Sequence, residues 1–123
     1  MASDKIPWDL VKKLAELYRK NPAALKTSVD GKIETLHGIR YTKEGIEDLL
    51  NQTGKNITEL FIMPIVRPED ENKQPADQFF SFALAGIDDQ NNLITDLVFE
   101  YGDPCPKACT ANYRDEFGLN DSE

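Results

Sequence analysis

Apolar residues recur with helical spacing near the start of the chain. Leu10, Leu14 and Leu17 follow at i, i+4 and i+7, with charged residues between them. This spacing predicts an amphipathic helix whose apolar face docks on a core. Pro7 suits the first turn, and Pro22 disfavours helical geometry in the residue before it, so the helix is expected to end just before Pro22.

A second, shorter helix is expected after Thr42. Thr42 is its predicted N-cap, because a threonine hydroxyl accepts a hydrogen bond from the first turn of a helix. Ile46, Leu49 and Leu50 form its predicted buried face. Gly54 is placed to end it.

Between the two helices the pattern is weaker. Residues 23–32 indicate a turn of helix followed by a tight turn at Asp30-Gly31. Residues 36–41 indicate a short extended segment.

From Ile57 onwards the spacing favours strands. The nearly continuous apolar segment 60–66 is too short and too rich in strand-forming residues for a helix, so it predicts a buried strand. Pro64 cannot donate to a ladder, which places that strand at an edge or at a bulge. After a turn-rich loop, segment 93–99 is expected to be the last strand of a hairpin.

Segment 79–87 alternates unevenly and predicts a strand with two different faces. Bulky residues lie on one face, and Ser81, Ala83 and Ala85 lie on the other. The bulky face is expected to meet helices, and the thin face is a candidate surface for a partner or a small ligand.

The order of these elements predicts an α+β fold. We expect a three- to four-stranded antiparallel meander sheet with two helices packed on one face. A single domain is predicted over residues 1–109, followed by a flexible acidic tail over residues 110–123. A partly apolar sheet face left uncovered would favour a homodimer.

The charge is uneven along the chain. Residues 1–60 carry 10 Lys and Arg against 9 Asp and Glu, whereas residues 61–123 carry 4 against 13, so the net charge of −8 arises in the second half. An acidic surface repels phosphate backbones and anionic lipids, which disfavours nucleic-acid and membrane binding. It allows a basic protein partner, such as a basic toxin that the chain would neutralise.

The loop of residues 67–77, between the predicted strands 60–66 and 79–87, is expected to be fully solvated. Its carboxylates at 69–71, and those of Asp88 and Asp89 in the hairpin loop, are therefore poor candidates for acid and base catalysis, which needs carboxylates in a cleft. The chain shows no signal peptide and no apolar run of membrane-spanning length, so a cytoplasmic location is expected.

Both cysteines lie in the segment GDPCPKACT. In a reducing compartment Cys105 and Cys109 are expected as thiols that pack the tail on the sheet. A reversible disulfide or redox role is an alternative, although three intervening residues differ from the two of a thioredoxin-type pair. A metal site is another alternative, in which His37 and a further ligand would complete a zinc set.

His37 and Trp8 are two further site candidates. His37 stands without a recognisable nucleophile motif, which favours a surface or capping role over that of a base. Trp8 is expected to anchor the first helix, with ligand stacking as the alternative.

Five segments of the chain form a recognisable set: PWDLVKKLAELYRKN, RYTKEGIEDLL, TELFIMPIV, FFSFALAGID and LVFEYGDPCPKAC. Together they resemble a group of short bacterial proteins with no assigned activity. The resemblance extends over residues 6–109. Its distinctive part is the ending at Gly102, Cys105, Pro106 and Cys109, where the group has a C-P-x-x-C segment. It implies a shared fold and nothing about catalysis, because no activity is assigned to the group.

The sequence therefore predicts a non-enzymatic protein-interaction domain that requires no cofactor. Two alternatives remain open: a thiol-based redox or metal-binding protein that uses Cys105 and Cys109, and a small-ligand-binding domain.

Overall fold

The computed structural model describes residues 5–100, 102–105 and 109–119. The helices are α1 (Trp8–Lys20), α2 (Lys43–Leu50) and α3 (Tyr113–Phe117). The strands are β1 (Lys26–Val29), β2 (Lys32–Thr35), β3 (Gly38–Arg40), β4 (Ile57–Val66), β5 (Phe80–Asp88), β6 (Leu93–Phe99) and β7 (Asp103–Cys105). Two 3-10 turns, Pro68–Asp70 and Pro75–Asp77, connect β4 to β5. No helix among these residues is long and apolar enough to cross a membrane.

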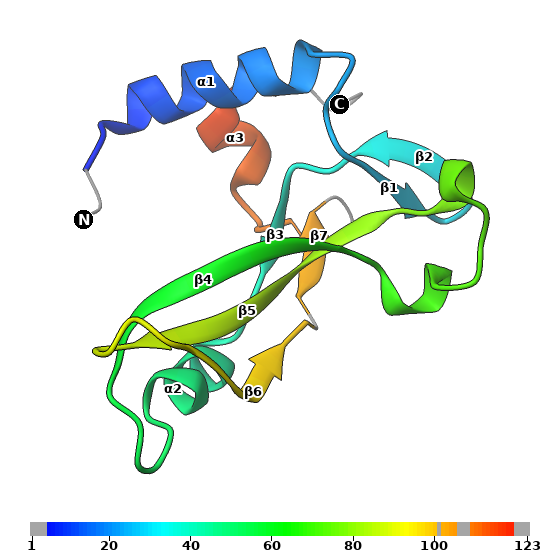
Figure 1. The fold of residues 1–123 in the computed structure, drawn as a ribbon. Coiled ribbons are helices and arrows are strands. Elements are labelled where there is room, and N and C mark those ends of the chain that lie inside the picture. The colour runs from blue at the N-terminus through cyan, green and yellow to red at the C-terminus, as the bar shows by residue number, and fades with distance from the viewer. Residues whose placement is uncertain (1–4, 101, 106–108, 120–123) are drawn as a thin grey trace.

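The strands form antiparallel sheets, as Figure 1 shows. Strands β4, β5 and β6 make the three-stranded meander that the sequence predicts, with Ile62 opposite Leu84 and Leu84 opposite Phe99. The prediction of a single sheet is wrong, because β1 pairs with β2 and β3 pairs with β7 in two further sheets. The fold is α+β, with its strands divided among three small sheets.

The hairpin of β1 and β2 replaces the turn of helix expected over residues 23–32. The predicted turn at Asp30-Gly31 is confirmed, because both residues have positive φ angles, 51° and 83°. Two successive positive φ angles match the twist of a two-residue hairpin. The short extended segment predicted before α2 is also confirmed as β3.

Helix α2 begins as the sequence predicts. The hydroxyl of Thr42 accepts a hydrogen bond from the N–H of Gly45 at 3.0 Å, which satisfies one of the helix's unpaired amides. Leu49 is completely buried, and α2 contacts β5 and β6. Leu50 is more exposed than predicted, and the helix ends there rather than at Gly54.

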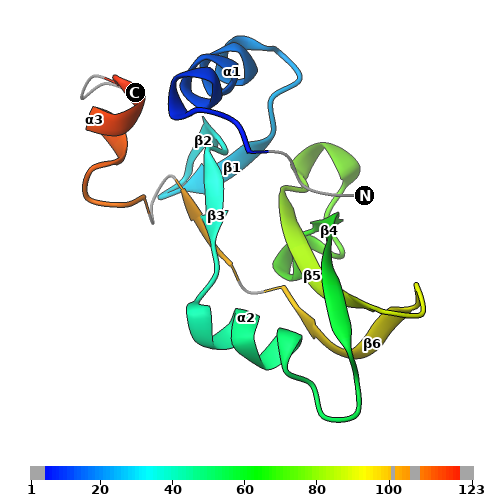
Figure 2. The same cartoon turned by 90° about the vertical axis from the view of Figure 1, so that its left-hand side faces the viewer.

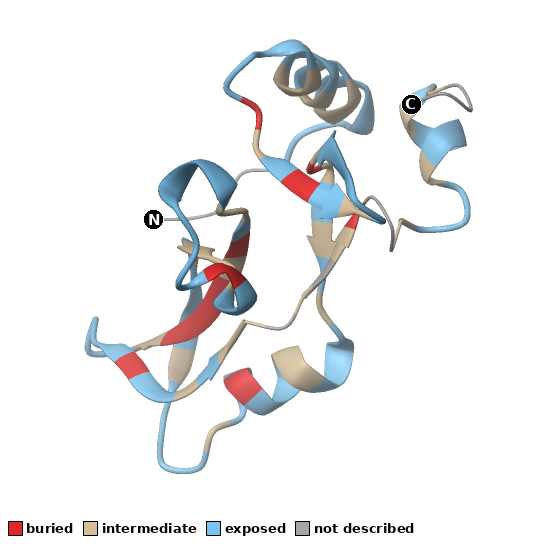
Figure 3. Cartoon of the chain, turned by 90° about the vertical axis from the view of Figure 1, so that its right-hand side faces the viewer, coloured by how far each residue is buried: buried red, intermediate tan, exposed pale blue. Residues whose placement is uncertain are grey.

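The core is small and centres on β5. In Figure 3, β5 is the strand with the longest buried stretch. The buried apolar residues are Ala24, Leu36, Leu49, Ala83, Leu84, Ala85, Ile94 and Cys105. Because several of these side chains are small, the sheet buries little apolar area for its length.

The predicted packing of both helices on one face of a single sheet is not confirmed. Figures 1 and 2 show α2 beside the meander, whereas α1 lies at the other end of the molecule, above β1 and β2. The hydroxyl of Tyr18 fastens α1 there: it donates to the carbonyl of Leu36 at 2.6 Å and accepts from the N–H of Leu25 at 3.1 Å. The apolar stripe of α1 is largely exposed among the described residues.

The loop between β4 and β5 is less solvated than its composition predicts. Asp70 is 1% exposed, and its carboxylate accepts a hydrogen bond from the N–H of Phe79 at 2.9 Å and pairs with Lys73 at 2.9 Å. Burial raises the pKa of Asp70, but these two interactions outweigh it and hold the pKa below its usual range. Asp70 therefore ties the loop to the start of β5.

Candidate functional site

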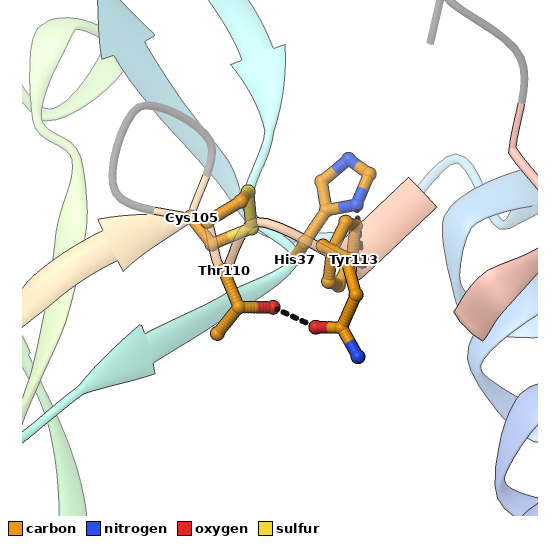
Figure 4. The surroundings of a disulfide bond; sticks show 6 residues. His37, Cys105, Thr110 and Tyr113 are labelled. Carbon is orange, nitrogen blue, oxygen red and sulfur yellow. Dashed lines mark hydrogen bonds between the residues drawn. A yellow bond between two sulfur atoms is a disulfide. The ribbon is translucent and has the colours of Figure 1, made fainter. Parts of the chain in front are cut away.

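Cys105 and Cys109 form a disulfide, with their Cα atoms 4.5 Å apart (Figure 4). The expectation of free thiols is therefore wrong in this structure. Cys105 is buried and Cys109 is half-buried. Pro106, which the sequence resemblance includes, lies outside the described residues.

Pairing between β3 and β7 positions this disulfide. Cys105 lies opposite Gly38, and its carbonyl accepts a hydrogen bond from the N–H of His37 at 2.6 Å. The approach of the two strands is close at Gly102, where a Cβ atom would lie 2.0 Å from Cγ2 of Ile39. Only glycine fits there, which gives this residue of the distinctive segment a packing role.

The segment predicted as a flexible tail, residues 110–123, contains a short helix. Residues 113–117 form α3, and residues 120–123 lie outside the described range. Helix α3 docks on α1: the ring centroids of Trp8 and Phe117 are 4.8 Å apart, and the indole N–H of Trp8 donates to the carbonyl of Glu116 at 3.3 Å. Trp8 thus anchors α1 to α3, a partner that the sequence analysis did not consider.

His37 faces α3 rather than the disulfide sulfurs (Figure 4). Its Nδ1 atom is hydrogen-bonded to the hydroxyl of Tyr113 at 2.6 Å, and the two rings meet edge to face. Burial raises the pKa of Tyr113, and the nearby Arg19 lowers it in part. Arg19 also lies over the ring of Phe117, 5.8 Å from its centroid.

Residues of α1, β2 and α3 line a pocket of about 910 Å³ that lies between these three elements. Its lining includes His37, Tyr113, Cys109 and charged side chains of both signs. The charged residues are Glu16, Arg19, Lys20, Glu34, Arg114 and Asp115.

The groups at the pocket that could take part in covalent chemistry contact their neighbours. The sulfur of Cys109 is held in the disulfide, and the hydroxyl of Thr110 donates to Asn112 at 3.1 Å. His37 is hydrogen-bonded to the Tyr113 hydroxyl, so a base and a hydroxyl lie within reach of each other here. Over the described ranges, no group of three or more His, Cys, Asp or Glu side chains is placed to hold a metal ion.

The candidate binding surface on the thin face of β5 is covered. Ser81, Ala83 and Ala85 are all buried. Ala83 and Ala85 belong to the apolar core. Trp8, the fourth candidate, remains about half-exposed at the edge of α3.

Two apolar surfaces that the sequence analysis assigned to the core are exposed instead. The first is the α1 stripe, defined as Leu10, Leu14 and Leu17; Leu17 is 57% exposed, and a shallow pocket of about 390 Å³ adjoins it. The second is the β4 patch, defined as Leu60, Phe61 and Ile62. The sequence signals the apolar character of both surfaces, but not that the described residues leave them exposed.

Comparison of the chain with known proteins found no matching family model, no matching curated protein and no matching solved structure.

Proposed function

We propose that the chain is a non-enzymatic protein-interaction domain that works as a homodimer. The observation that carries this proposal is the apolar surface that the described residues leave exposed in the α1 stripe and the β4 patch, where Leu17 is 57% and Ile62 is 58% exposed.

Exposed apolar surface of this kind is typical of an interaction site. Single exposed apolar residues are common on monomers, whereas those of the α1 stripe and of the β4 patch lie together along one helix and one strand. Burying such surface is the main favourable term in most protein associations, so a partner would stabilise the chain considerably.

A second copy suits these surfaces better than a basic partner does. The acidic residues that would attract a basic protein are absent from the α1 stripe and the β4 patch, which consist of Leu, Phe and Ile. Interface cores are depleted in charge, and a homodimer interface is more apolar than a transient one.

Sedimentation equilibrium of the purified chain tests this proposal. Over a dilution series at physiological salt, we expect a mass near twice 13.9 kDa. A dimer held by apolar burial should persist at high salt, whereas binding driven by surface charge should weaken there. A monomer at every concentration would contradict the homodimer.

Thiol chemistry is the second candidate function, and the disulfide itself favours it. A dithiol reductant would donate two electrons and two protons to the Cys105–Cys109 bond, producing two thiols here and a disulfide in the reductant. Cys109 lines the pocket and is half-buried, so its sulfur offers the more accessible point of attack.

A further inference from the structure

The outer edge of β4 offers a place for the second copy to bind. The strand order β4-β5-β6 puts β4 at one edge of its sheet, and β4 extends from Ile57 to Val66. Within the described residues, no strand pairs with its other side. An edge strand of this length presents a row of backbone donors and acceptors that another strand can complete.

We propose that β4 pairs antiparallel with β4 of a second copy, so that the two meanders join into one continuous sheet. The inference rests on the proposed homodimer and specifies the surface that forms it. The interface is isologous: each chain contributes the same strand around a two-fold axis.

The exposure pattern of β4 favours strand pairing over helix docking. Leu60, Phe61 and Ile62 are consecutive, so they point alternately to opposite faces of the sheet, and all three are exposed. A helix laid on the sheet would cover only one of these faces. A neighbouring strand brings cross-strand side chains to both faces at once.

The other strand edges are less suited to pairing. The second edge of the meander, β6, carries Asp96, which pairs with Lys55 at 3.5 Å, and its register with β5 shifts between Leu84 and Gly86. Charges and irregular pairing are common protections of a sheet edge. Strands β1 and β2 have four residues each and include lysines, whereas β4 has ten residues and a single charge, Glu59.

Self-pairing of β4 also avoids charge repulsion between two acidic chains. An antiparallel pairing centred on Phe61 places each Glu59 opposite the partner's Met63. The two carboxylates are then separated by about four residues, or roughly 14 Å along the strand. This exceeds the Debye length of about 8 Å at physiological salt, so their repulsion is largely screened. Pro64 removes one backbone donor near the end of the strand and leaves the centre intact.

The test compares matched lysine substitutions on the two edge strands. Ile62→Lys in β4 changes a residue that is 58% exposed, and Val98→Lys in β6 changes one that is 43% exposed, so neither removes much core. We expect Ile62→Lys to weaken dimerisation at least about 100-fold, because it sets two ammonium groups against each other near the two-fold axis. Val98→Lys should leave the dimer intact. The measurement is sedimentation equilibrium, with circular dichroism to confirm folding.

Hydrogen exchange identifies the kind of contact. Amides of β4 should exchange more slowly in the dimer than in the Ile62→Lys monomer, whereas a side-chain contact alone would leave their exchange unchanged and would overturn strand pairing. If the lysine variant does not fold, Ile62→Thr keeps a β-branched side chain and should still weaken the dimer.

The outcomes separate this inference from the proposed function. A dimer that survives Ile62→Lys but is lost in Leu14→Lys, on the α1 stripe, would overturn the β4 interface and keep the homodimer. A wild-type chain that is monomeric throughout would contradict both.

Discussion

The meander end and the α1 end of the molecule are held together by different kinds of interaction. At the meander end, Leu49 of α2 is completely buried and contacts the region of β5 and β6, where Leu84 and Ala85 are also buried. At the α1 end, the apolar stripe of the helix is exposed, and polar and ring contacts of Tyr18 and Trp8 fix its position. One end depends on apolar burial, and the other depends on directional contacts.

This difference determines what each end can tolerate. Apolar burial is non-directional and responds to lost volume, whereas a hydrogen bond to a buried carbonyl responds to the loss of a single atom. The two ends should therefore respond to different substitutions, which can be ranked by expected size.

Removing the side chain of Leu49 should have the largest effect. Leu49→Ala leaves a cavity in a fully buried position, and we expect it to lower the free energy of unfolding by about 2–5 kcal/mol. Leu50→Ala, at the adjacent and partly exposed position, is the matched control and should cost about 1 kcal/mol or less. Urea unfolding followed by circular dichroism measures both. Equal losses would mean that the meander end does not depend on burial of Leu49.

Removing the hydroxyl of Tyr18 should have an intermediate effect. Tyr18→Phe keeps the ring but leaves the carbonyl of Leu36 and the N–H of Leu25 without this partner, and we expect a loss of about 1–3 kcal/mol. Tyr41→Phe is the matched control at the other end, because the Tyr41 hydroxyl donates to the carbonyl of Phe82 in β5. A smaller loss from Tyr18→Phe than from Tyr41→Phe would contradict the view that hydroxyl bonds hold the α1 end.

The same difference explains how much of the fold the sequence could predict. Apolar periodicity correctly located α1, α2 and the three meander strands, and the capping role of Thr42 was visible because its signal is local. Periodicity identifies an apolar face but not what covers it. It therefore assigned the stripe of α1 to a core, whereas these leucines are exposed in the described part of the chain.

The candidate site was less predictable because long-range contacts build it. Tyr113 lies 76 residues from His37, and no local pattern marks a five-residue helix that docks through ring contacts. The proximity of the two cysteines was visible, but their pairing as a disulfide was only an alternative to free thiols, since spacing alone does not determine redox state. Asp70 was missed for a similar reason: its burial depends on the N–H of Phe79, nine residues away.

Breaking the disulfide should have the smallest effect on stability. The bond closes a loop of only a few residues, so the chain-entropy estimate assigns it about 2 kcal/mol at most. We expect the double variant Cys105→Ser, Cys109→Ser to lose no more than this, and to remain dimeric because neither residue belongs to β4. Reduction of the wild-type chain with excess dithiol, followed by the same urea unfolding, is the matched control.

The redox midpoint of this bond then decides between a structural and a chemical role. Equilibration in dithiol buffers of graded potential, followed by thiol alkylation and mass measurement, gives the fraction reduced at each potential. The redox candidate requires a midpoint above about −270 mV, in the range of proteins that exchange disulfides, whereas structural disulfides lie below about −300 mV. A midpoint in the lower range would contradict thiol chemistry at Cys105 and Cys109. The Cys105–Cys109 disulfide contributes little stability whether its role is structural or chemical. Its reduction potential is therefore the measurement that distinguishes a bond that only positions α3 from one that exchanges with other thiols.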